Sequence, residues 1–97
     1  INSCRSYFHQ ARVFDFQKKK ADQMQALKTI VNGECRDNGD RGLIVANSRL
    51  MLAEMYLKQR DKTKAREQLS AFNKQWADAD TNLVAMQLAK KLSKKIR

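Results

Sequence analysis

Residues 52–69, which read LAEMYLKQRDKTKAREQL, decide the fold expected of this chain. Leu52 and Tyr56 lie four residues apart, so they fall on one side of a helix. Ala65 and Leu69 repeat that spacing after an Arg-Asp pair that interrupts the pattern. Two helical patterns separated by so short a break predict an antiparallel helical hairpin.

The same apolar spacing extends outward from this hairpin to the whole chain. In the predicted helix at about 3–17, apolar residues at three- and four-residue steps form one face. Val13 and Phe16 lie off this face, so we expect the helix to bury two sides. The absence of proline and the presence of only three glycines argue against a β-sandwich or barrel. The sequence therefore predicts an all-α fold of antiparallel hairpins, with helices at about 3–17, 21–31, 43–59, 62–76 and 83–96.

The chain is strongly basic. Its 97 residues include 20 lysines and arginines against 10 aspartates and glutamates, a formal net charge of +10. A positive charge of this size attracts acidic proteins, nucleic acids or anionic lipid surfaces. It is equally typical of a solvated surface that keeps the protein soluble. No DNA-reading motif accompanies the charge, and no apolar run is long enough to span a bilayer. The basic patch has two parts, one at a helix corner and one along the last helix: Lys18, Lys19, Lys20, Lys90, Lys91, Lys94 and Lys95.

Residues 52–69 resemble a tetratricopeptide repeat, a pair of antiparallel helices that stacks on its neighbours. The resemblance rests on the small Ala53 and Ala65, on Tyr56 as a wedge between helices, and on Asp61 as a helix cap. Arg60 departs from the family pattern, which usually has glycine at that place. The resemblance implies one domain over 1–97, the C-terminal repeat region of a larger bacterial protein. Its parts are repeat 1 at about 3–32, which matches in pattern only, repeat 2 at about 43–76 and a capping helix at about 82–97.

The resemblance also implies a function in protein binding. Stacked repeats form a wall from the first helix of each pair, and family members bind peptides there. The candidate peptide-binding residues are Asn47, Arg49, Glu54 and Lys58. We therefore expect a non-catalytic interaction or sensory module that binds a protein or peptide, with an acidic partner favoured by the charge. The alternatives are a helical domain that binds nucleic acid or an anionic membrane surface, and a homodimer, because two repeats fall short of the usual three.

The two cysteines offer a disulfide. Cys4 opens the first predicted helix and Cys35 follows the second, so an antiparallel hairpin brings them near each other. A bridge would indicate a periplasmic or other extracytoplasmic location, whereas two unrelated free cysteines would fit the cytoplasm. Two cysteines and the single histidine, His9, are too few for the usual metal site, and no arrangement suggests a catalytic triad. We expect no metal, no cofactor and no enzymatic activity.

Overall fold

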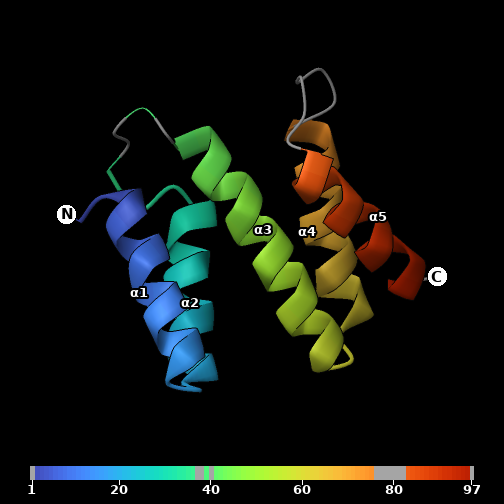
Figure 1. The fold of residues 1–97 in the computed structure, drawn as a ribbon, viewed down its shortest axis with the longest axis horizontal. Coiled ribbons are helices and arrows are strands. Elements are labelled where there is room, and N and C mark those ends of the chain that lie inside the picture. Colours follow the sequence, from blue (N-terminus) through green and yellow to red (C-terminus); the bar gives the residue numbers. More distant parts are fainter. Residues whose placement is uncertain (1, 37–38, 40, 76–82, 97) are drawn as a thin grey trace. The chain divides into compact units, whose positions relative to one another are not determined.

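The computed structural model describes residues 2–36, 39, 41–75 and 83–96, and within them the regular structure is entirely α-helical (Figure 1). The predicted all-α fold is therefore confirmed, and each predicted helix is found within about two residues of its expected ends. Within the described ranges, the only β-type pairing is an isolated bridge between Ser3 and Arg36. The helices are α1 (Cys4–Phe16), α2 (Lys20–Val31), α3 (Arg41–Lys58), α4 (Lys62–Gln75) and α5 (Leu83–Ile96).

The chain divides into two compact units, Ile1–Ser48 and Arg49–Arg97, and the boundary falls inside α3. In unit 1, α1 and α2 pack side by side as a hairpin joined by a short turn (Figure 1). Ser3 caps α1, because its hydroxyl accepts a hydrogen bond from the Ser6 backbone N–H at 3.1 Å. Gly33, with φ of 74°, supplies the left-handed residue that follows the end of α2.

One expectation for unit 1 is wrong. Val13 and Phe16 were expected to bury a second side of α1, but their side chains are 39% and 89% exposed. The buried residues of α1 are Cys4 and Ala11, seven apart and therefore on a single stripe. Leu43, near the start of α3, is an apolar side chain that is also 48% exposed. These three side chains are apolar, but the sequence does not show which face of each helix packs against a neighbouring helix.

Unit 2 contains the hairpin predicted from residues 52–69. The three residues on which the family resemblance rests most, Ala53, Tyr56 and Ala65, are all buried. α4 packs against α5. The core of unit 2 is apolar and comes from all three of its helical segments: Leu50, Leu52, Ala53 and Tyr56 from α3, Ala65, Leu69 and Phe72 from α4, and Ala89 and Leu92 from α5.

The turn between α3 and α4 is tight. Arg60 adopts φ of 63°, the left-handed conformation that costs a non-glycine residue about 1–2 kcal/mol. The Asp61 N–H donates a hydrogen bond back to the Tyr56 carbonyl at 2.8 Å. The Asp61 carboxylate in turn accepts a hydrogen bond from the Lys64 N–H at 3.1 Å, which is the cap predicted for α4. Residue 76, the predicted end of this helix, lies outside the described residues.

The cap at Asp61 can be tested by substitution. We expect Asp61→Ala to lower the free energy of unfolding by about 1 kcal/mol, because a backbone N–H of the first turn loses its acceptor. Asp61→Asn retains an acceptor and should stay close to the wild type. Urea unfolding followed by circular dichroism measures the difference, with the exposed Asp15→Ala as the control for removing one negative charge. Equal losses for the alanine and asparagine variants at position 61 would contradict the capping role.

Candidate protein-interaction site

The four candidate contact residues all lie on α3, but they do not share one face of it. A helix advances about 100° per residue, so Asn47, Glu54 and Lys58 fall within roughly 40° of one another. Arg49 lies on the opposite side of the same helix. Two sides of one helix cannot both line one groove, so α3 offers two separate candidate surfaces.

The first surface contains an ion pair. The Lys58 ammonium lies 3.5 Å from the Glu54 carboxylate, one helical turn away. The Lys58 side chain is largely exposed to solvent, and the Glu54 side chain is about half exposed. Such pairs contribute little to stability, typically about 0.3–0.5 kcal/mol. Each charge already has a partner, so this surface presents little net charge to a ligand. Asn47, on the same stripe, is half-buried.

The second surface is formed by Arg49 together with Gln68 of α4. The Arg49 Nη1 donates a hydrogen bond to the Gln68 Oε1 at 3.4 Å, a long contact with a neutral acceptor. The Arg49 Nε is buried and finds no acceptor in the part of the chain that the structure describes. Burial also lowers the pKa of the Arg49 guanidinium from its ordinary value, because the charged form loses solvation.

Within those same described residues, Arg49 makes no ion pair. Arg49 as a whole is half-buried, and a cation that has lost part of its hydration is stabilised by an anionic partner. A carboxylate is the partner that suits it best, since the planar guanidinium presents parallel N–H donors to its two oxygens. The arrangement can therefore bind an anionic group that another molecule supplies. The sequence pointed to Arg49 but could not show that its Nε is buried, or that no carboxylate in the described part of the chain pairs with it.

Tyr56 has a contact that the sequence did not reveal. The Lys64 ammonium of α4 lies 5.8 Å from the centre of the Tyr56 ring, within cation–π range. Tyr56 itself is buried, and this lysine lies over its ring. The contact joins α3 to α4 near their turn and helps to fix the hairpin that positions Arg49 and Gln68.

The basic patch consists of two exposed clusters, one on each unit. Lys18, Lys19 and Lys20 lie at the turn between α1 and α2, and all three are exposed. The lysines of the second cluster are also exposed and follow the outer side of α5: Lys90, Lys91, Lys94 and Lys95. Each cluster is a surface of its own unit.

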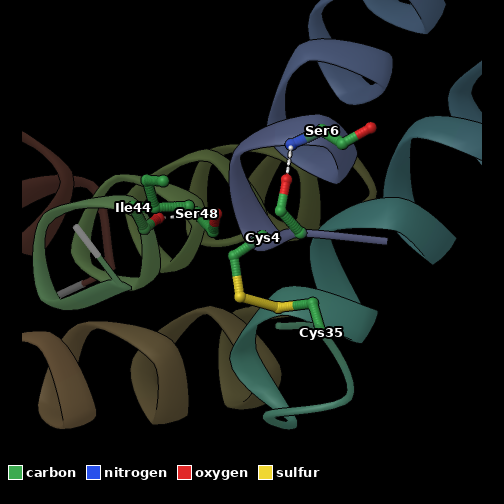
Figure 2. The surroundings of a disulfide bond; sticks show 6 residues. Cys4, Ser6, Cys35, Ile44 and Ser48 are labelled. Atoms are coloured by element: carbon green, nitrogen blue, oxygen red, sulfur yellow. Dashed lines mark hydrogen bonds between the residues drawn. A yellow bond between two sulfur atoms is a disulfide. The ribbon is translucent and has the colours of Figure 1, made fainter. Parts of the chain in front are cut away.

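The predicted disulfide between Cys4 and Cys35 is present. Their Cα atoms lie 4.9 Å apart, and the bond closes a loop of 31 residues (Figure 2). Both cysteines are buried, and the chain on either side of the bond is paired as well. The Cys4 N–H donates to the Arg36 carbonyl at 2.9 Å, and the Arg36 N–H donates to the Asn2 carbonyl at 3.0 Å. The disulfide therefore fastens the start of α1 to the segment that follows α2.

The described residues contain no group of three or more histidine, cysteine, aspartate or glutamate side chains placed to hold a metal ion. Across the same residues, none of the helices combines the length and the apolar character needed to cross a bilayer. An open hollow of about 510 Å³ lies on α4, and its described lining includes none of the predicted contact residues. Its described lining is Thr63, Arg66, Glu67, Ser70, Ala71 and Lys74.

In comparisons with known proteins, no family model, curated protein or solved structure matches the chain.

Proposed function

We propose that this chain is a non-catalytic protein-interaction module of tetratricopeptide type, part of a larger bacterial regulatory or assembly protein. The buried Ala53, Tyr56 and Ala65 support the repeat, because they occupy the close-packed places that the family pattern assigns to them. The partner is a protein or peptide that presents a carboxylate. The net charge of +10 favours partners of that kind.

The observation that carries this proposal is that Arg49 makes no ion pair with any residue that the structure describes. Its Nε is buried without an acceptor, and its single described hydrogen bond goes to a neutral amide. A cation held in this way loses solvation and gains little in return, whereas a bound carboxylate would supply both charge and acceptors. Gln68, beside it on α4, has an amide that can donate a second hydrogen bond to the same ligand.

The disulfide supports a location of the module outside the cytoplasm. Disulfides persist in oxidising compartments and are rare in the reducing cytosol. We infer that the chain works in the periplasm or another extracytoplasmic space, where its partner would also be found.

Peptide binding provides the test. An array of random peptides with free C-terminal carboxylates, and a matched array of the same peptides as C-terminal amides, would be probed with the oxidised protein. We expect Arg49→Ala to lower the affinity for peptides with a free carboxylate about 10- to 100-fold. This range corresponds to the loss of a charged hydrogen bond, which contributes about 1.5–3 kcal/mol. Arg49→Lys should recover only part of the affinity, because lysine keeps the charge without the bidentate geometry.

Two controls separate this site from its alternatives. Arg66→Ala removes the same charge from an exposed position of α4 and should leave binding unchanged. If Arg66→Ala weakens binding as much as Arg49→Ala, or if all binding disappears by about 0.3 M salt, the attraction is a general electrostatic one. A loss on Asn47→Ala alone would move the contact surface to the opposite side of α3. Circular dichroism checks that each variant is folded.

A further inference from the structure

An exposed apolar pair lies on α1, far from the proposed peptide site in sequence. Phe16 is 89% exposed and Val13 is 39% exposed, and a spacing of three residues places them on one side of the helix. Phenylalanine is among the residues that are most often buried, so an almost fully exposed one is unusual. The exposed Phe16 side chain therefore contributes little to the packing of unit 1.

The apolar pair lies beside the first lysine cluster. α1 ends at Phe16, and Lys18, Lys19 and Lys20 follow at once, with Lys18 turned into the left-handed conformation at φ of 61°. The exposed Arg12 adds a fourth cation, and Asp15 and Asp22 are the carboxylates of the same segment, so cations outnumber anions by two to one. None of these four cations forms an ion pair within the ranges that the structure describes.

We propose that this tip of the α1–α2 hairpin binds an anionic lipid surface. Phe16 and Val13 would enter the boundary between the headgroups and the acyl chains, while the lysines contact lipid phosphates. Interfacial binding of this kind grows with the apolar area inserted and with the electrostatic attraction to anionic lipids. The proposal concerns a second surface and does not depend on the peptide site at Arg49.

The shape and size of the tip favour a lipid surface over a protein. A stable protein interface buries about 800 Å² on each partner, and two side chains at a helix end supply only a small part of that area. A protein would also have to provide a pocket for a protruding phenylalanine, whereas a fluid bilayer adapts to it. The disulfide lies at the other end of α1, about 18 Å away at 1.5 Å per residue, so the bond holds the hairpin together without covering its tip.

Sedimentation with large unilamellar vesicles tests this inference on the oxidised chain. The anionic vesicles contain one part phosphatidylserine to two parts phosphatidylcholine, and the neutral vesicles contain phosphatidylcholine alone. We expect binding to the anionic vesicles only. Phe16→Ala should lower the partition coefficient about tenfold. Replacing Lys18, Lys19 and Lys20 together by glutamine should lower the partition coefficient about a hundredfold, because each lysine that is lost lowers it roughly fivefold.

Matched variants show whether the effect is local. Leu43→Ala removes another exposed apolar side chain of unit 1, and glutamine at Lys90, Lys91 and Lys94 removes three charges from unit 2. Both should bind vesicles like the wild type. The proposal is overturned if anionic vesicles are not bound, if Phe16→Ala binds them normally, or if the unit 2 variant loses as much as the unit 1 variant. Normal vesicle binding by Phe16→Ala together with displacement by polyglutamate would instead assign the tip to acidic proteins.

Discussion

Phe72→Ala is expected to lower the free energy of unfolding by about 3–5 kcal/mol, while the same substitution at Phe16 changes it by less than about 0.5 kcal/mol. Phe72 lies on α4 and has no exposed surface, so its removal leaves a cavity lined by the core of unit 2. Phe16 is almost fully in solvent and has little packing to lose. The two substitutions delete identical atoms, and the difference between them measures burial alone.

Urea unfolding followed by far-ultraviolet circular dichroism gives both values under the same conditions. Phe72→Leu should fall between the wild type and Phe72→Ala, because leucine refills part of the cavity. Similar losses at positions 16 and 72 would mean that α1 buries the side that the structure leaves exposed. That result would also remove the basis for a lipid-binding tip.

Opening the Cys4–Cys35 disulfide is expected to cost about 3–4 kcal/mol. The bond closes a loop of 31 residues, and the loss follows from the greater conformational entropy of the unfolded chain when this loop is released. The effect is large for an assembly of short helices, because α1 and α2 together bury only a small apolar core. Hydrogen exchange should show the loss of protection in α1 and α2 more strongly than in α4.

Two preparations measure this effect independently. The wild type is unfolded in urea with and without a reducing agent, and the Cys4→Ala/Cys35→Ala double variant is treated in the same way. The reduced wild type and the double variant should have similar stability, and only the wild type should respond to the reductant. The intact mass of the oxidised wild type should be lower than that of the reduced form by the two thiol hydrogens. A reductant effect below about 1 kcal/mol would show that the bond contributes little to folding.

Much of the local structure is determined by sequence alone. The three- and four-residue spacing of apolar side chains places all five helices close to their observed ends, because this period is a property of the helix itself. The capping of α1 by Ser3 and of α4 by Asp61 is likewise local, since each cap satisfies an N–H only three residues away. The burial of Ala53, Tyr56 and Ala65 follows the hairpin pattern for a related reason: the two helices are joined by so short a turn that they must pack.

Tertiary structure decides the rest. The apolar character of Phe16 and Phe72 is the same, and only the arrangement of neighbouring helices leaves one in water and encloses the other. Spacing allowed a bond between Cys4 and Cys35 without requiring it, because their separation depends on how α1 and α2 pack. The chemistry of Arg49 was equally hidden in the sequence. Its Nε is buried, and no carboxylate among the described residues pairs with it, because of what the fold places around it. Desolvation depends on the surroundings of a side chain and not on its identity.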